Sequence, residues 1–206
     1  MKKVLIVAYL YPPAGGVGAH RITKYVKYLP GTGWQPHVLT VKEKFYELVD
    51  PTLGKDIPDT VTVSRTGTLN CSRLVKRFAG SPYTLPGLDQ DNNKRTLRGK
   101  FKPPLLRLLK LLSHHIFVPD YEVGWLPFGI LRGINLFKKC PPDVLFITGS
   151  PYSSFLIGLI LRKAFSVPLV IDLRDAWTLN VWRMKEKTPL KRSIERHMEH
   201  IVVKNA

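Results

Sequence analysis

Residues 4–21 read VLIVAYLYPPAGGVGAHR, and this stretch decides the fold class of the chain. Its first five residues form an unbroken apolar run, which is typical of a strand buried on both faces at the centre of a parallel sheet. Gly15, Gly16 and Gly18 follow two prolines, and a helical pattern begins near Ala19. The stretch therefore predicts a strand, a glycine-rich turn and the start of a helix.

The glycine-rich turn has two interpretations. Glycine lacks a Cβ, so the backbone N–H groups can approach a phosphate closely, and the helix N-terminus adds the positive end of its dipole. Alternatively, the glycines make only a tight turn and let the helix pack on the sheet. The turn has no Gly-Lys-Ser/Thr, which excludes a P-loop, and Arg21 stands where the dinucleotide fingerprint has its third glycine.

Composition restricts the class of protein and of partner. The chain has 206 residues, of which 44% are hydrophobic, so it can bury a substantial core. Its net charge of +17 favours an anionic partner such as a nucleic acid, a phosphorylated ligand or acidic lipid headgroups. Cys71 and Cys140 are its only cysteines, which argues against a disulfide framework, favours a cytoplasmic location and implies no cofactor. No apolar run reaches the roughly 20 residues that span a bilayer.

Helical and strand patterns alternate along the rest of the chain. We expect helices over 20–29, 125–139, 155–165 and 189–200, and strands over 36–41, 60–65, 143–148, 168–173 and from 201 onward. Serines before residue 155 are expected to cap the third of these helices. The alternation predicts an α/β fold, a Rossmann-like open parallel sheet flanked by helices, in a single domain over 1–206. Ligands bind such sheets at the carboxyl ends of the strands.

The segment 65–115 interrupts this alternation. It carries eleven Lys or Arg residues against two aspartates. We interpret it as a basic, partly mobile insertion whose leucine-rich part, 103–116, forms a helix that packs in a core groove or lies on an anionic membrane surface. The second case predicts a peripheral location on the inner face of the cell membrane. A nucleic-acid-binding module is the weaker alternative, because Phe101 is the only aromatic residue among the basic residues of 94–110.

Four stretches, in their order and spacing, resemble the N-terminal half of family 4 glycosyltransferases, which are retaining, nucleotide-sugar-dependent enzymes with the GT-B fold. They are YPPAGGVGAHR at 11–21, PDYEVGW at 119–125, PPDVLFITGSPYSS at 141–154 and VPLVIDLRDAW at 167–177. The resemblance implies an acceptor-binding domain of an enzyme that transfers a sugar to a cell-surface glycan or a lipid-linked acceptor. It also implies a C-terminal domain that grips the nucleotide sugar. This sequence contains no such domain, so we expect the chain alone to be inactive.

The resemblance also implies roles for particular residues. Gly15 and Gly16 match the loop that meets the diphosphate of the donor. Arg174 and Asp175 match a catalytic pair in which many relatives have a histidine before the aspartate. The residues implied for the acceptor are His20, Ser150, Tyr152, Ser153 and Asp172. The nucleotide-diphosphate sugar is a substrate, and no cofactor or metal is implied.

Two alternatives stay open at this point. Asp172, Arg174 and Asp175 could instead form a local ion-pair cluster that only shapes the pocket. A dinucleotide-dependent oxidoreductase would need an acidic residue at the end of the second strand, where Lys42 stands with Glu43 just beyond it, and we rank this class last.

Overall fold

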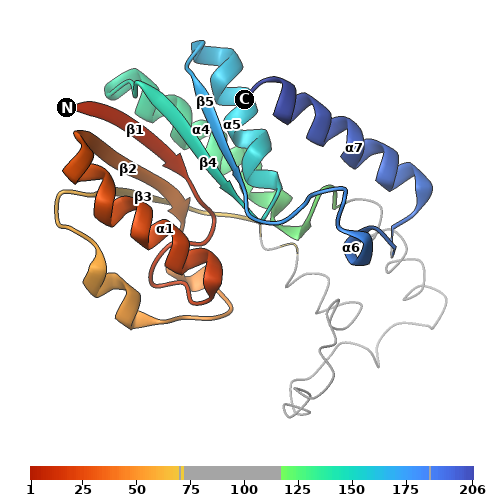
Figure 1. Ribbon diagram of the computed structural model, residues 1–206, viewed down its shortest axis with the longest axis horizontal. Helices are drawn as coiled ribbons and strands as arrows, with labels where there is room; N and C mark the ends of the chain where they lie inside the picture. Colours follow the sequence, from red (N-terminus) through yellow and green to blue (C-terminus); the bar gives the residue numbers. More distant parts are fainter. Residues whose placement is uncertain (70, 72–116, 186) are drawn as a thin grey trace.

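A computed structural model describes residues 1–69, 71, 117–185 and 187–206. Within these residues the fold is built on one parallel sheet of five strands in the order β3-β2-β1-β4-β5 (Figure 1). The strands are β1 Lys2–Val7, β2 Trp34–Val41, β3 Thr62–Thr66, β4 Val144–Gly149 and β5 Leu169–Leu173. The predicted α/β fold with an open parallel sheet is confirmed, and the strand predicted over 60–65 lies at the sheet edge.

Strand β1 is buried on both faces, as its unbroken apolar run predicts. Leu5 and Val7 belong to a core cluster with residues of α4 (Leu126–Lys139) and α5 (Ser153–Phe165). Val4 and Ile6 belong to a second cluster with residues of α1 (Val17–Tyr28). Helices therefore cover both faces of the central strand (Figure 1). Each such side chain stabilises the fold by roughly 1.5–3 kcal/mol on burial.

The remaining helices lie beyond these layers. Helix α6 spans Val181–Lys185, and α7 spans Pro189–Lys204 and packs beside α5 (Figure 1). In the described part of the chain, short 3₁₀ helices connect the elements: η1 Leu29–Thr32, η2 Glu43–Phe45, η3 Pro51–Asp56 and η5 Tyr121–Trp125. Among the described residues, no helix combines the length and the apolar character that crossing a membrane requires.

The strand predicted from residue 201 is wrong. Residues 201–203 form the last full turn of α7, and Val202 is buried in the core. The short apolar run continues a helical stripe that contains Met198 and Val202, four residues apart, so it is one face of the helix.

The predicted serine cap of α5 is also wrong. Its N-cap residue is Tyr152, with no side-chain cap of its own. Instead, Asp120 from a distant segment accepts a hydrogen bond from the N–H of Ser153 at 3.0 Å.

The basic insertion predicted over 65–115 falls almost wholly outside the described residues. So does the leucine-rich helix expected over 103–116.

Candidate functional site

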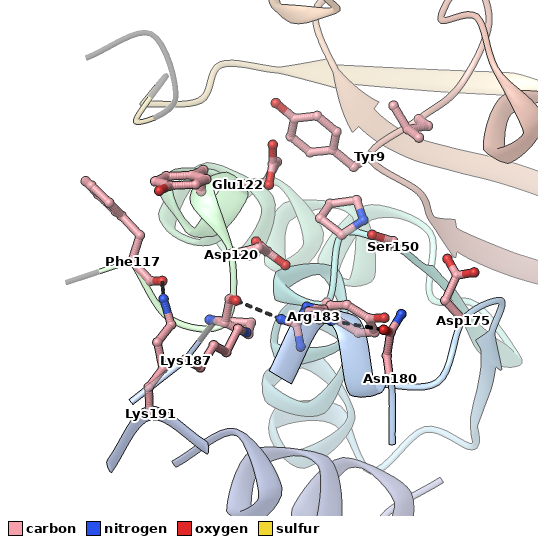
Figure 2. A pocket seen from close by; sticks show the side chains of 15 residues that line it. Tyr9, Phe117, Asp120, Glu122, Ser150, Asp175, Asn180, Arg183, Lys187 and Lys191 are labelled. Carbon is pink, nitrogen blue, oxygen red and sulfur yellow. Dashed lines mark hydrogen bonds between the residues drawn. The ribbon is translucent and has the colours of Figure 1, made fainter. Parts of the chain in front are cut away.

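A cleft of about 510 Å³ opens at the carboxyl ends of β1, β4 and β5 (Figure 2). Tyr9 follows β1, Ser150 and Tyr152 follow β4, and Asp175 follows β5. The order of strands reverses between β1 and β4, so the cleft lies at the topological switch point, where open α/β sheets bind ligands. The segment 117–122 and residues of α6 and α7 form the opposite wall.

Arg174 joins the glycine-rich turn to the β4 turn. Its Nε donates to the carbonyl of Gly149 at 2.9 Å, and its Nη2 donates to the carbonyl of Ser150 at 2.9 Å. A Cβ on Gly18 would lie only 2.1 Å from Nη1 of Arg174. The guanidinium therefore occupies the space that any side chain at position 18 would take, and Gly18 lets the start of α1 approach it.

The ion-pair cluster proposed for Asp172, Arg174 and Asp175 does not form. Asp172 accepts from Arg21 at 2.7 Å and from the hydroxyl of Thr148 at 2.9 Å. Within the described part of the chain, Arg174 makes no ion pair with either aspartate.

The glycine turn itself divides into two parts. The N–H of Gly15 donates to the carbonyl of Leu48 at 2.9 Å, within a bridge between Ala14 and Val49. Gly16 precedes α1 with a φ of 90°, a conformation that favours glycine. The N–H groups of Ala19 and His20 donate to the carbonyl of Gly16, so the amides of residues 16–18 are the ones placed to meet an anion.

The other predicted acceptor residues separate into two groups. Ser150 and Tyr152 line the cleft, as does Asp175 of the predicted catalytic pair. Ser153 is fully buried beneath it, and His20 is exposed on α1 outside the lining. Tyr152 is only 4% exposed, because its ring stacks on Trp177 with centroids 4.9 Å apart. The structure thus brings together part of the predicted set.

Sequence reasoning missed a buried charge network behind the wall of the cleft that α6 and α7 form. Glu195 is completely buried and accepts hydrogen bonds from Arg183 at 2.6 Å, from the indole of Trp177 at 3.1 Å and from Lys187. An acidic residue within the apolar stripe of α7 was the signal that could have found it. Arg183 also donates to the carbonyl of Pro119 at 2.9 Å.

The titratable groups of this wall have shifted pKa values. Burial lowers the pKa of Lys187 to about 8, although its hydrogen bond to Glu195 acts in the opposite direction. Burial and the positive charge of Arg183 also lower the pKa of Lys191. Burial raises the pKa of Asp120, against the effect of its hydrogen bonds.

No protein-family model matches this chain, and no curated protein is similar to it in sequence. Solved structures with a similar chain path include the C-terminal domain of a hydrogenase from Pyrococcus furiosus, at 14% identity and a TM-score of 0.41, covering 84% of this chain and 91% of that one. UGT2 from Phytolacca americana, complexed with UDP-2fluoro-glucose and pterostilbene, matches at 10% identity and a TM-score of 0.41, covering 83% of this chain and 30% of that one. A UDP-N-acetylglucosamine 2-epimerase matches at 14% identity and a TM-score of 0.38, covering 94% and 39%. Similarities this weak assign no function.

Proposed function

We propose that this chain is the acceptor-binding, N-terminal half of a retaining family 4 glycosyltransferase. The enzyme would transfer a sugar from a nucleotide-diphosphate donor to a cell-surface glycan or a lipid-linked acceptor. One observation carries the proposal. Three segments that bear the sequence resemblance, 11–21, 149–154 and 172–177, lie far apart in the chain and meet at the carboxyl edge of the sheet, where Arg174 connects them.

The proposed roles follow from the positions of the groups. The amides that begin α1 and the guanidinium of Arg174 would stabilise the negative charge that grows on the departing diphosphate. Ser150 and Asp175 would hold the hydroxyl-bearing end of the acceptor in the cleft. The chain has no histidine at position 174, so in this proposal the departing phosphate takes the proton of the acceptor hydroxyl.

The proposal includes a second domain that grips the nucleotide sugar, so the 206-residue chain should bind acceptor sugars without transferring to them. It also includes a cytoplasmic enzyme that lies on the inner face of the membrane. That last element depends on the basic segment 65–115, which lies almost entirely outside the described residues.

Saturation-transfer NMR on the 206-residue chain tests the proposal. A panel of saccharides should receive saturation from the protein, and Asp175→Asn should weaken this transfer because Asp175 lines the cleft. Asp143→Asn is the matched control, since Asp143 precedes β4 at the opposite, amino end of the strand. There it accepts a hydrogen bond from the N–H of Lys3 at 2.6 Å.

Two results would contradict the proposal. One is the absence of saturation for every saccharide tested. The other is an equal loss for Asp175→Asn and Asp143→Asn, which would place sugar binding outside the cleft. Measurable sugar transfer by the chain alone, from any nucleotide sugar, would refute the proposed division into two domains.

A further inference from the structure

The cleft has a cationic end, formed by Arg183, Lys187 and Lys191. All three side chains line it, and they come from α6, from the turn after it and from the first turns of α7. Figure 2 shows Lys187 and Lys191 on the side of Phe117, away from Ser150 and Asp175. The cationic end is therefore spatially separate from the end where the strand termini meet.

Among the described residues, the cations of the cationic end exceed its ionised carboxylates. Glu195 ion-pairs with Arg183 and Lys187. Asp120 lies nearby, but burial raises its pKa and so disfavours its ionised form. Glu122 lies on the wall beside Tyr9, and Asp175 lies at the other end (Figure 2).

The ammonium group of Lys187 can serve a ligand as well as the protein. An ammonium group donates up to three hydrogen bonds. Lys187, whose side chain is 12% exposed, uses one on Glu195, and Lys191 donates to the carbonyl of Phe117 at 3.0 Å. The charge of Arg183 disfavours the protonated form of both lysines, and a bound anion would relieve this repulsion.

We propose that the cationic end of the cleft binds an oxyanion, a carboxylate or phosphate group carried by the acceptor. In naming the acceptor class, this inference rests on the proposed function. The acceptor hydroxyl would then lie toward Ser150 and Asp175, while its acidic group contacts Lys187 and Lys191. The pairing of opposite charges would set the direction in which the acceptor enters the cleft.

Isothermal titration of the 206-residue chain with inorganic pyrophosphate, at pH 7 and low salt, tests the site directly. Lys187→Gln and Lys191→Gln should each weaken binding roughly tenfold, because each removes a charge-assisted hydrogen bond. Lys185→Gln is the matched control. It removes the same charge from an exposed side chain of α6 that does not line the cleft, and it should change the affinity less than twofold.

A second arm separates the two possible sources of the anion. Glucuronate and glucose share a sugar ring and differ by the carboxylate, so tighter binding of glucuronate, lost in Lys191→Gln, would assign the site to an acidic sugar. Pyrophosphate binding without this preference would assign it to a phosphate group. Near-ultraviolet circular dichroism checks that each variant folds. If Lys187→Gln does not fold, the affinity of Lys191→Gln by itself tests the anion site.

The proposal is overturned if pyrophosphate and glucuronate both fail to bind, or if the three variants and the unaltered chain bind them equally. These outcomes differ from failure of the proposed function. Neutral saccharides could still bind in an Asp175-dependent way, which would leave the glycosyltransferase proposal standing without an anionic acceptor.

Discussion

Replacing Glu195 with glutamine should destabilise the protein strongly. The carboxylate is fully buried and accepts from two cations whose side chains are only 21% and 12% exposed. An amide keeps the shape of the side chain, but it removes the negative charge and leaves Arg183 and Lys187 without compensation. Breaking a buried pair in this way costs about 3–5 kcal/mol, a large share of the 5–15 kcal/mol that stabilises a typical domain.

Urea unfolding followed by tryptophan fluorescence measures this cost, since Trp177 donates to Glu195. Glu199→Gln is the matched control one turn further along α7. Its carboxylate accepts from Thr178, an uncharged partner, so its free energy of unfolding should fall by about 1 kcal/mol or less. Adding Lys187→Met to Glu195→Gln should restore at least about 1 kcal/mol, because it removes one uncompensated cation. Equal losses for Glu195→Gln and Glu199→Gln would refute the reasoning.

Two further predictions concern Gly18 and Lys187. Gly18→Ala should displace the guanidinium of Arg174 and lower the free energy of unfolding in urea by about 1 kcal/mol. Gly31→Ala should be neutral, because its Cβ would meet nothing within 4 Å. Similar values for both variants would contradict the close approach of Gly18 to Arg174. The pKa of Lys187 is about 8 when folded against 10.5 when unfolded, so between these values the unfolded chain binds more protons and stability rises with pH. From pH 8 to 10.5, the free energy of unfolding of the unaltered chain should rise by up to roughly 3 kcal/mol relative to that of Lys187→Met. A constant difference between their urea midpoints across that range would show that the pKa of Lys187 is not lowered.

Local patterns predicted the elements of this fold well. The apolar run after Lys3 became β1, and the glycine turn became the start of α1. The strands predicted over 143–148 and 168–173 became β4 and β5, with boundaries that differ by at most one residue. Such patterns succeed because burial on two faces requires continuous apolar residues, which local sequence displays directly. The same pattern failed at 201–203, where three apolar residues fit a strand and a helix face equally well.

Contacts between distant segments were the part that sequence patterns missed. Asp120 caps α5, which begins more than 30 residues later, and the local serines that favour a cap are buried instead. Asp172 pairs with Arg21 on α1, although Arg174 stands only two residues from it in the sequence. A side chain selects its partner from whatever the packed layers bring within reach, and sequence separation carries little of that information.

The sequence by itself determined the α/β class, the position of β1 at the centre of the sheet and the edge of the sheet where a ligand would bind. These properties follow from hydrophobic periodicity and from the geometry of parallel strands, which are local and additive. Only the tertiary structure decided which residues form the cleft. It added Arg183, Lys187 and Lys191 from the far end of the chain and excluded Ser153 and His20 from the lining. The reason is physical: membership of the cleft depends on how α6 and α7 pack against α5, and that packing is a property of the whole core.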